Sequence, residues 1–363
     1  MSNLILVAHD PGAAQMLLGI VGEAKWRGHA LRFCADGPAV DIWRGQGLVV
    51  EQFAAADEAA NFELAKWSDI VVSGTGFGPF EITCWSELGR RGVATFAAID
   101  AWTNLEKRFS THTPGGVLIQ PDAIGVVDQY SIDLIVAEGW CSAPLYIVGQ
   151  PNLQRISGLV KKARKSHKPN RQTTIVFFSE PIVQDFPDGS RGFDQYDVFN
   201  QIMLNLPSET ICRILVKPHP RECIEGWMKI IGDWSNKVPL SLEITQQNSD
   251  DLLSMADGVI GMMTAVLMEA ALSNVPVLAL QPSRKKVFVP IIDELMPVVT
   301  ESFQIPEALS SLFKTSDVAV GNSDRLSSIA KNADTRFVEA VELVLQEKAE
   351  SLNLNAGPIG GNI

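Results

Sequence analysis

The sequence is poor in positive charge and in histidine. Its 363 residues contain 30 Lys and Arg against 42 Asp and Glu, and only 5 His, which gives a formal net charge of −12. A protein that binds nucleic acid in general needs a basic face to neutralise phosphates. The charge balance therefore argues against a nucleic-acid partner, and any positively charged site must be local.

Paired cysteines and long hydrophobic runs are also missing. The five cysteines are odd in number and scattered, at Cys34, Cys84, Cys141, Cys212 and Cys223. This spacing is typical of reduced thiols in a cytoplasmic protein, not of a disulfide framework or a metal site. No apolar run approaches the length that crosses a bilayer, and no basic leader precedes the first apolar run. We expect a cytoplasmic protein, with contact to the inner face of the cell membrane left open.

What the sequence has is an alternation of short apolar runs with amphipathic stretches. Hydrophobic residues make up 46% of the chain and charged residues 20%, which suffices for a substantial core, and the length suits two domains. The alternation is typical of βαβ units. It predicts an α/β fold with two Rossmann-like, doubly wound domains that face one another across a cleft.

The alternation stops once and then starts again, which divides the chain. Between the two series lies a basic, polar stretch around Lys161–Lys168, which is typical of a solvated linker. The predicted organisation is an N-terminal domain over 1–155, a linker over 156–172, a C-terminal domain over 173–330, and a helix with a flexible tail over 331–363. Among the helices, one is expected over 13–27, and an amphipathic stretch over 324–348.

Three potential cations follow one predicted strand of the second half. The run Ile214-Leu215-Val216 leads into Lys217-Pro218-His219-Pro220-Arg221. The prolines hold this turn stiff and non-helical, and phosphate binding gains most when its donors need no reordering. Ligands of open parallel sheets bind at the carboxyl ends of the strands. Lys217, His219 and Arg221 are therefore predicted to bind a phosphate. The alternative is a proline-rich strand exit whose charges only face water.

A second segment points to the same phosphate. Residues 257–280 are predicted to form a buried strand, a tight turn, a helix and another buried strand. The turn is Gly261-Met262-Met263-Thr264, and the N–H groups where the helix starts can receive an anion. Glu269 lies in an otherwise apolar helix, where a carboxylate needs a partner or a function, such as accepting hydrogen bonds from sugar hydroxyls. The alternative is an ordinary N-cap at Thr264 and an exposed polar position at Glu269.

In the first half, His9-Asp10-Pro11-Gly12 follows the first predicted strand and precedes a helix. A His or Asp at this place can act as a general base near neutral pH, and Gly12 permits the close approach of a ligand. The alternative is that Asp10 caps the helix and His9 is a polar strand end. His9 and Asp10 are both candidate catalytic residues, with no choice made between them.

Other residues that follow strands of the first half are expected to line the same cleft. Gly74-Thr75-Gly76-Phe77-Gly78 follows a later strand but lacks the spacing and the acidic partner of a dinucleotide fingerprint. Asp100 and Trp102 offer an acid and an aromatic wall, with burial in the core as the alternative. The predicted cleft-lining residues are Gly12, Gly74, Thr75, Gly76, Asp100, Trp102 and Gln150.

Metal and nucleophile patterns were not found. His29, His112 and His167 are isolated from other ligand types, so no metal site is predicted. No Ser or Cys shows the nucleophile-elbow pattern. We therefore expect no cofactor.

Taken together, these segments resemble the two-domain glycosyltransferase architecture called GT-B. More narrowly, the chain is similar to bacterial surface-polysaccharide enzymes, among them capsule Kdo and sialic acid transferases and CDP-glycerol glycerophosphotransferases. The similar segments are Val216-Lys217-Pro218-His219-Pro220, the stretch from Gly261 to Glu269 with Pro276-Val277, and Val148-Gly149-Gln150-Pro151. The last also resembles the turn before the second domain of hydrolysing UDP-N-acetylglucosamine 2-epimerases.

The resemblance implies a donor nucleotide site in the second domain. Lys217 and His219 would hold the phosphates together with the turn that ends at Thr264, and Glu269 would contact the ribose. The two methionines of this turn stand where relatives often have small or hydroxyl residues, which leaves the phosphate contacts there to the backbone. The predicted donor site comprises Ser179, Glu180, Lys217, His219, Arg221, Gly261, Met262, Met263, Thr264 and Glu269.

The resemblance also implies a metal-independent transferase that moves a sugar or sugar-like group from a nucleotide donor to a cell-surface polysaccharide. His9 or Asp10 would deprotonate the acceptor hydroxyl, while the cations stabilise charge on the leaving phosphate. Closure near Gln150 would exclude water. One alternative is an isomerase of the nucleotide-sugar 2-epimerase type, which needs several acids and bases around the sugar. Another is a non-catalytic protein that binds nucleotide sugars.

Overall fold

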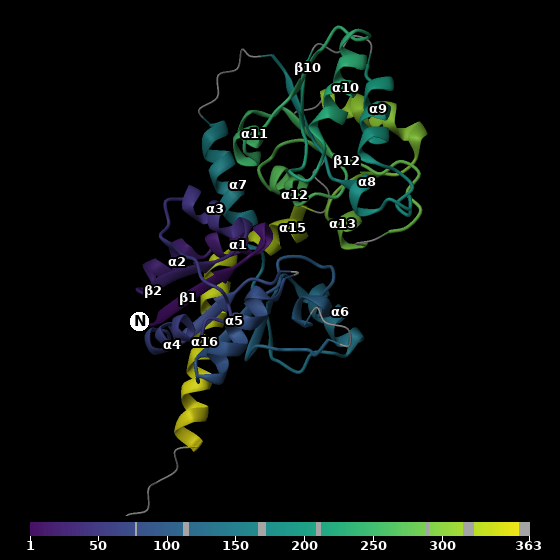
Figure 1. Ribbon diagram of the computed structural model, residues 1–363. Coiled ribbons are helices and arrows are strands. Elements are labelled where there is room, and N and C mark those ends of the chain that lie inside the picture. The colour runs from purple at the N-terminus through teal and green to yellow at the C-terminus, as the bar shows by residue number, and fades with distance from the viewer. Residues whose placement is uncertain are drawn as a thin grey trace, which may run out of the picture. The chain divides into compact units, whose positions relative to one another are not determined.

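The computed structural model divides the chain into two compact α/β domains (Figure 1). It describes residues 1–76, 78–111, 116–165, 172–207, 212–287, 290–314 and 323–355. The first domain comprises Met1–Gln154 and Ser328–Ile363, and the second comprises Arg155–Ser327. Each domain is built on one parallel sheet.

A seven-stranded sheet forms the centre of the first domain, in the order β3-β2-β1-β4-β5-β6-β7. Its strands are β1 (Asn3–Ala8), β2 (Ala30–Ala35), β3 (Val50–Glu51), β4 (Ile70–Ser73), β5 (Ala94–Ala98), β6 (Ala123–Val126) and β7 (Leu145–Ile147). The chain runs outward from β1 through β2 and β3 and then returns to add β4 on the other side. The loops after β1 and β4 therefore leave the sheet side by side, at the switch point where ligands bind in such folds.

Both faces of this sheet are buried, because its central strands are apolar throughout. Leu4 and Leu6 of β1 belong to one hydrophobic cluster, and Ile5 and Val7 belong to another on the opposite face. Helices cover the two clusters. They are α1 (Pro11–Leu18), α2 (Val21–Trp26), α3 (Pro38–Gly45), α4 (Glu58–Trp67), α5 (Pro79–Arg90), the 3-10 helix η1 (Glu106–Phe109), α6 (Gln129–Glu138) and α16 (Ala333–Asn355).

The helix predicted over 13–27 is two helices, so that expectation is corrected. α1 ends at Leu18 and α2 begins at Val21. Gly19, between them, lies against Pro151, and a Cβ at Gly19 would stand 2.5 Å from the Pro151 carbonyl carbon. The break therefore depends on a tertiary contact that helical periodicity does not reveal.

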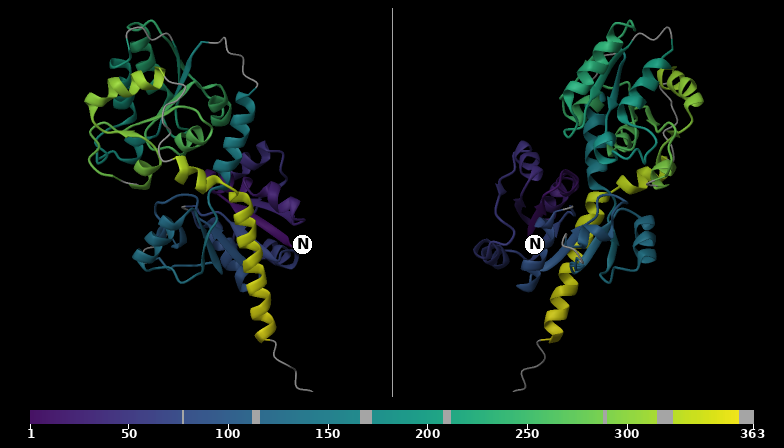
Figure 2. Two further views of the ribbon diagram at one scale, coloured as in Figure 1. Left: turned by 180° about the vertical axis from the view of Figure 1, so that it is seen from behind. Right: turned by 45° about the vertical axis from the view of Figure 1, so that its right-hand side comes forward.

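Helix α16 brings the end of the chain back to the first domain, beside its sheet in both views of Figure 2. Phe337 is fully buried, and its ring meets that of Phe96 edge-on, with the centroids 5.4 Å apart. Gln154 accepts the N–H of Ala333 through Oε1 at 2.6 Å, which caps the start of the helix. Residues 333–355 are thus part of the first domain, where the sequence predicted a separate helix and tail over 331–363.

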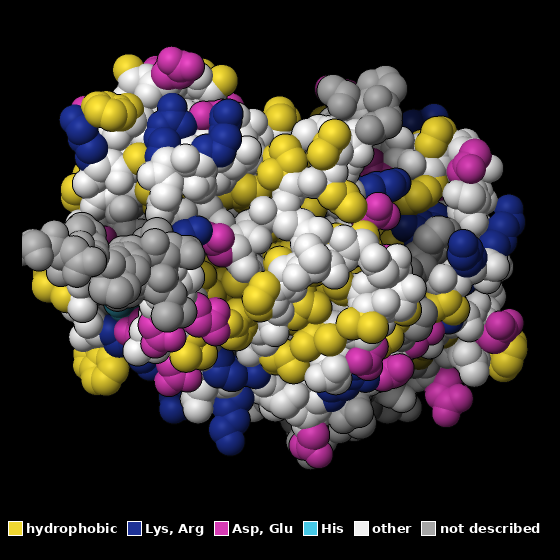
Figure 3. Space-filling model, turned by 90° about the horizontal axis from the view of Figure 1, so that it is seen from below, with side chains coloured by type: hydrophobic (Ala, Val, Ile, Leu, Met, Phe, Trp, Pro, Cys, Tyr) yellow, Lys and Arg dark blue, Asp and Glu magenta, His cyan; other side chains and the backbone are white. Residues whose placement is uncertain are grey.

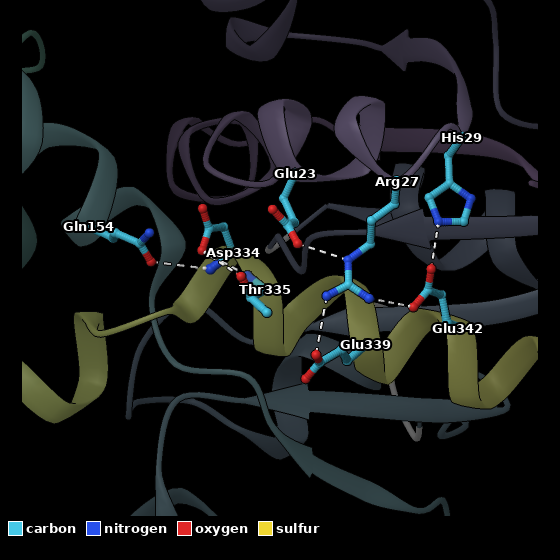
Figure 4. Close-up of polar contacts among 8 residues, drawn as sticks. All are labelled: Glu23, Arg27, His29, Gln154, Asp334, Thr335, Glu339 and Glu342. Atoms are coloured by element: carbon cyan, nitrogen blue, oxygen red, sulfur yellow. Dashed lines mark hydrogen bonds and ion pairs between the residues drawn. The ribbon is translucent and has the colours of Figure 1, made fainter.

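An ionic network joins α16 to the end of α2 (Figure 4). The Arg27 guanidinium binds Glu23 at 2.8 Å on its own helix. It also reaches Glu339 at 3.1 Å and Glu342 at 2.8 Å on α16. Nε2 of His29 lies 3.0 Å from the second oxygen of Glu342. The Arg27 and His29 side chains are 20% and 3% exposed, while Glu339 and Glu342 lie nearer the surface. The network therefore links α16 to the rest of the first domain at its rim.

The amphipathic stretch predicted over 324–348 is also broken into two helices. α15 (Ser323–Ala330) ends before α16 begins at Ala333. Asn332 between them has φ = 52°, a left-handed conformation that Asn tolerates better than most residues. The apolar periodicity alone did not reveal this turn.

The second domain repeats the plan with a six-stranded sheet in the order β10-β9-β8-β11-β12-β13. Its strands are β8 (Thr174–Phe178), β9 (Arg213–Lys217), β10 (Ser241–Ile244), β11 (Gly258–Gly261), β12 (Val277–Leu280) and β13 (Val298–Val299). Helix α7 (Pro151–Arg164) begins in the first domain and enters the second at Arg155. The other helices of the second domain are α8 (Ile182–Asp185), α9 (Gln195–Leu204), α10 (Ile224–Ser235), α11 (Ser249–Met255), α12 (Ala265–Leu272), α13 (Pro290–Leu295), the 3-10 helix η2 (Ser302–Gln304) and α14 (Ile305–Lys314). The switch point lies between β8 and β11, and the loops after these strands carry most of the predicted donor residues.

Helix α7 occupies much of the stretch predicted as a linker over 156–172. Leu153, Ile156 and Val160 are buried at helical spacing, while Lys161 and Lys162 are exposed. Arg164 donates to the carbonyl oxygen of Ala256 within the second domain. The basic cluster is thus the outer face of an amphipathic helix as far as Arg164, and 166–171 lie outside the described residues.

The predicted fold class, two Rossmann-like α/β domains, is confirmed. That the domains face one another across a cleft stays a prediction. On the surface seen in Figure 3, hydrophobic side chains are interspersed with charged ones. Large apolar side chains that remain exposed include Trp26, Val136 and Leu343. In the part of the chain that the structure describes, no helix is both long and apolar enough to cross a membrane.

Candidate functional site

The first domain gathers polar residues at its switch point. His9 and Asp10 follow β1, and Gly74 follows β4, whose Ser73 pairs with Val7. Asp100 comes two residues after β5, the next strand along. Three of the loops singled out from the sequence therefore meet at one edge of the sheet.

His9 and Asp10 form a pair. Nδ1 of His9 lies 2.8 Å from Oδ1 of Asp10, and about 30% of each side chain is exposed. Asp10 stands at the N-cap position of α1, but its side chain makes no capping hydrogen bond, so the capping alternative does not describe it. The contact favours the tautomer with hydrogen on Nδ1, which leaves the lone pair on Nε2. Nε2 lies against Gly37, where a Cβ would stand only 2.6 Å away.

Glu81 joins this pair and was not identified from the sequence. It is the third residue of α5, yet its side chain is buried, and Oε1 accepts the N–H of His9 at 2.9 Å. A Cβ at Gly76 would lie 2.8 Å from Asp10 Oδ2 and 3.1 Å from Glu81 Oε1, so the bare glycine lets the two carboxylates approach it. Burial, with the charge of Asp10 added, raises the pKa of Glu81 to about 7 although the His9 N–H opposes the shift.

Asp100 is held by Arg108, a second residue that sequence reasoning missed. Nη1 of Arg108 donates to Asp100 Oδ1 at 2.8 Å and to the Thr75 carbonyl oxygen at 2.9 Å. Only 6% of the Arg108 side chain is exposed. A Cβ at Gly12 would stand 2.0 Å from Asp100 Oδ2, so helix α1 begins directly against this carboxylate. The edge thus carries an ion pair beside the His9–Asp10 pair.

The other predicted cleft-lining residues lie in different surroundings. Gln150 donates from Nε2 to the Asp100 carbonyl oxygen at 2.8 Å, which ties the end of the domain to this loop. A Cβ at Gly74 would stand 2.3 Å from that of Ala13, so Gly74 permits close packing of α1. Trp102 is buried and donates to Asp128 Oδ1 at 3.0 Å. For Trp102 the core alternative therefore fits better than an exposed aromatic wall.

In the second domain, Lys217 ends β9 and lies beside Phe178, the last residue of β8. Burial lowers the pKa of Lys217, and its ammonium forms no ion pair with the residues that the structure describes. His219 accepts the N–H of Arg221 through Nδ1 at 3.2 Å. This places the proton of a neutral imidazole on Nε2, as a donor. Burial, and then the charge of Arg221, lowers the pKa of His219.

Arg221 is engaged elsewhere. Its guanidinium binds both carboxylate oxygens of Asp185, at 2.6 and 2.8 Å. The Ser179 hydroxyl is engaged as well, because it donates to Glu222 Oε1 at 2.8 Å. Glu222 is buried and also accepts the N–H of His219 at 2.6 Å, so it shapes this loop. Sequence reasoning did not find Glu222, which reads as an ordinary acid before a helix.

The polar groups of the turn between β11 and α12 form hydrogen bonds with other residues of the second domain. Gly261 and Met262 are buried, and the Met262 carbonyl oxygen accepts from Gln281 at 2.9 Å. Thr264 is the N-cap of α12, and its hydroxyl accepts the N–H of Val266 at 3.3 Å. The N–H of Met263 donates to Oε2 of Glu180 at 2.6 Å.

Glu180 therefore sits at the N-terminus of α12. Its carboxylate receives the backbone N–H groups of Met263 and Thr264, and burial raises its pKa to about 7 against these favourable bonds. The charge of Arg191 lowers the pKa, and that of Glu222 raises it. A carboxylate at this place occupies the amides that the sequence predicted for a phosphate.

Glu269 is buried, as Ser179 and Met262 are. Only 9% of its surface is exposed, and its charge acts on Arg155 of α7. The carboxylate on the apolar helix α12 thus has a cationic neighbour on α7 inside the second domain. Contact with a ribose stays a prediction.

Metal ligands do not converge in the part of the chain that the structure describes, where no three His, Cys, Asp or Glu side chains are placed to hold an ion. His112 and His167 lie outside the described residues. The prediction that the reaction needs no metal is not tested by this.

No protein-family model matches the sequence, and no curated protein matches it. Solved structures with a similar fold cover nearly the whole chain. UDP-GlcNAc 2-epimerase from Neisseria meningitidis, solved with UDP-GlcNAc bound, has a TM-score of 0.65 at 12% identity and covers 93% of this chain and 99% of its own. HepE from Anabaena, solved in complex with UDP-glucose, has a TM-score of 0.57 at 13% identity, with coverages of 97% and 100%.

MurG from Acinetobacter baumannii is a third similar structure, with a TM-score of 0.51 at 12% identity over 94% of this chain and 99% of its own. At such identities the likeness shows the fold alone. The architecture is GT-B-like, with two Rossmann-like domains. The narrower resemblance to capsule and other surface-polysaccharide transferases stays a prediction.

Proposed function

We propose that the chain is an enzyme that transfers a sugar or sugar-like group from a nucleotide donor to a hydroxyl of a cell-surface glycan, without a metal ion. The second domain binds the nucleotide phosphates, and the first supplies the base. Structures of similar fold that hold UDP-GlcNAc or UDP-glucose support a nucleotide sugar as the ligand. The glycan acceptor is supported by the resemblance of three short sequence segments.

The observation that carries the transfer reaction is the His9–Asp10 pair. With Nδ1 bonded to Asp10 at 2.8 Å, the imidazole is oriented, and Nε2 has the lone pair that a base needs. As it takes the acceptor proton, His9 becomes positively charged, and the adjacent carboxylate stabilises that charge. The hydroxyl oxygen becomes a stronger nucleophile toward the sugar.

The leaving phosphate gains negative charge as the bond to the sugar breaks. Lys217 and the Nε2–H of His219 are donors that reach it from the end of β9, and they stabilise this charge more in the transition state than in the bound donor. The lowered pKa of His219 suits a neutral donor that holds its proton in place. Lys217 supplies the net charge.

The proposal is tested by incubating the protein with UDP-, CDP- and CMP-sugars, with and without glycan acceptors, and measuring free nucleotide. Transfer or slow hydrolysis releases nucleotide. We expect His9→Ala and Asp10→Asn to lower turnover at least a hundredfold while nucleotide affinity stays within about twofold. Asp41→Asn, on the exposed face of α3, is the control and keeps full activity. Unchanged turnover in both variants would mean that neither His9 nor Asp10 is the base.

A nucleotide-sugar 2-epimerase is the second candidate, and the acids of the first domain favour it. Asp10, Glu81 and Asp100 lie at one sheet edge, and Glu81 has a pKa of about 7, which suits a group that exchanges protons with a sugar carbon. Epimerisation leaves an altered sugar on the nucleotide. Incorporation of deuterium from solvent into the recovered nucleotide sugar would support it, whereas a thermal shift without turnover would indicate a binding protein.

A further inference from the structure

The N-terminus of α12 is already filled in this structure. Oε2 of Glu180 lies 2.6 Å from the backbone nitrogen of Met263, and the Thr264 N–H also donates to this carboxylate. The Thr264 amide belongs to the N-cap of α12, and the Met263 amide lies one residue before it. The positive end of the helix dipole favours an anion at this place. A carboxylate of the chain thus takes the position that a ligand phosphate needs.

Two charged side chains act on the Glu180 carboxylate, in opposite directions. Arg191 is buried, with its guanidinium 3.9 Å from the centroid of the Phe186 ring, and its charge favours the carboxylate. Glu222, two residues before α10, opposes it. The carboxylate is therefore stabilised by the Met263 amide first, then by the charge of Arg191, and least by the Thr264 amide. A phosphate bound here would compete with it for the two amides.

We propose that Glu180 is an internal competitor for the anion site of the second domain, and that a ligand phosphate binds the α12 amides once Glu180 has taken up a proton from solvent. This inference rests on the proposed nucleotide site and adds a regulation to it. An ionised Glu180 would repel the phosphate at close range and keep the amides. A neutral Glu180 accepts hydrogen bonds less strongly and has an O–H that can donate to a phosphate oxygen.

Ligand affinity should therefore depend on pH, and the part of this dependence that comes from Glu180 should be absent from a protein that lacks its carboxylate. Because burial raises the pKa of Glu180 to about 7, its proton is present in most molecules at pH 6 and in few at pH 8. Apparent affinity scales with the competent fraction. The wild type should bind about tenfold more weakly at pH 8 than a protein without this carboxylate, about twofold more weakly at pH 7, and equally at pH 6.

The experiment compares the full-length wild type with Glu180→Gln and Glu180→Ala. Gln keeps an oxygen that accepts from Met263 and so preserves the turn, while Ala opens the space. Glu225→Gln is the control, since Glu225 is an exposed acid at the start of α10. Isothermal titration calorimetry at pH 6, 7 and 8 uses UDP-, CDP- and CMP-sugars and inorganic pyrophosphate. The ratio of variant to wild type at each pH cancels the titration of the ligand, of Lys217 and of His219.

We expect both Glu180 variants to show the tenfold gain at pH 8 that vanishes at pH 6, and the control to follow the wild type. Titrations in two buffers of different ionisation enthalpy should detect close to one proton more taken up by the wild type at pH 8 than by Glu180→Gln. Equal affinities of wild type and variants at every pH, for a nucleotide sugar that binds, would overturn this inference and leave the proposed function standing. The expected ratios with pyrophosphate, and no binding of any nucleotide sugar, would uphold the inference and reject the nucleotide site. No binding of either ligand to any of these proteins would overturn both.

Discussion

The guanidinium of Arg221 is held by the carboxylate of Asp185, with Nη1–Oδ1 and Nη2–Oδ2 distances of 2.6 and 2.8 Å. A two-bond contact of this kind fixes both direction and distance. Lys217 and His219, which share the same strand exit, make no such ion pair with the described residues. The three potential cations that the sequence places together are therefore unequally available to an anion.

We predict that Lys217→Ala weakens nucleotide binding at least tenfold and that Arg221→Ala weakens it less than about threefold, because Arg221 already has its counter-ion. Isothermal titration calorimetry measures both. Lys229→Ala, an exposed position on α10, is the control. Equal, large losses in the first two variants would mean that Arg221 leaves Asp185 to bind the ligand.

The architecture could be predicted because strands buried on both faces appear as uninterrupted apolar runs. β1 and β4 are examples, and their order along the chain gives a doubly wound sheet. Helix ends that depend on a contact with a residue distant in the sequence could not be predicted. The break at Gly19 depends on Pro151, and the return of α16 depends on a pocket for Phe337 that only the folded domain provides.

The place of a polar residue in the fold could be predicted where it ends or directly follows a strand, as Lys217 and His9 do, and the roles of both stay predictions. It was not predictable where the side chain starts from a helix or an irregular loop. Glu81 looks like an acid in the first turn of a helix, and Arg108 like a solvated loop cation. The one available signal was the apolar neighbourhood of Glu81, between Phe80 and Ile82, which makes a solvent-facing acid less expected.

Glu81 should make the stability of the first domain depend on pH. Its pKa of about 7 lies above the ordinary value of 4.5, so the folded state binds this proton more tightly than the unfolded chain. The stabilisation is complete below about pH 4.5 and is lost as the pH rises through 7. Relative to Glu81→Gln, the wild type should lose up to about 2.5 kcal/mol of unfolding free energy between pH 5 and pH 8.

Urea unfolding of both proteins at several pH values measures this difference. Glu58→Gln, an exposed acid in the first turn of α4, is the matched control and should leave the pH dependence of the wild type unchanged. A difference between wild type and Glu81→Gln that stays constant with pH would show that Glu81 is ionised throughout.

Phe337 tests whether α16 is part of the first domain. The side chain is fully buried against Phe96, so Phe337→Ala removes a large apolar group and leaves a cavity. We expect a loss of about 3–5 kcal/mol in unfolding free energy. Leu343→Ala removes a side chain that is 47% exposed and should cost less than about 1 kcal/mol. Similar small losses at both positions would mean that the helix is only loosely attached.

A substitution at Gly12 tests the role of Asp100 in turnover with little expected effect on the unfolding free energy. A Cβ there would stand 2.0 Å from Asp100 Oδ2, and the flexible carboxylate would have to move away from Arg108 to make room. We expect Gly12→Ala to lower turnover at least tenfold while the unfolding free energy falls by less than about 1 kcal/mol, because an end group shifts and the backbone does not. Gly22→Ala is the control, since no atom lies within 4 Å of its Cβ, and it should keep activity and gain about 0.5–1 kcal/mol of helix stability. Full activity in Gly12→Ala would remove Asp100 from the site, since its carboxylate cannot keep its place once that methyl group is present.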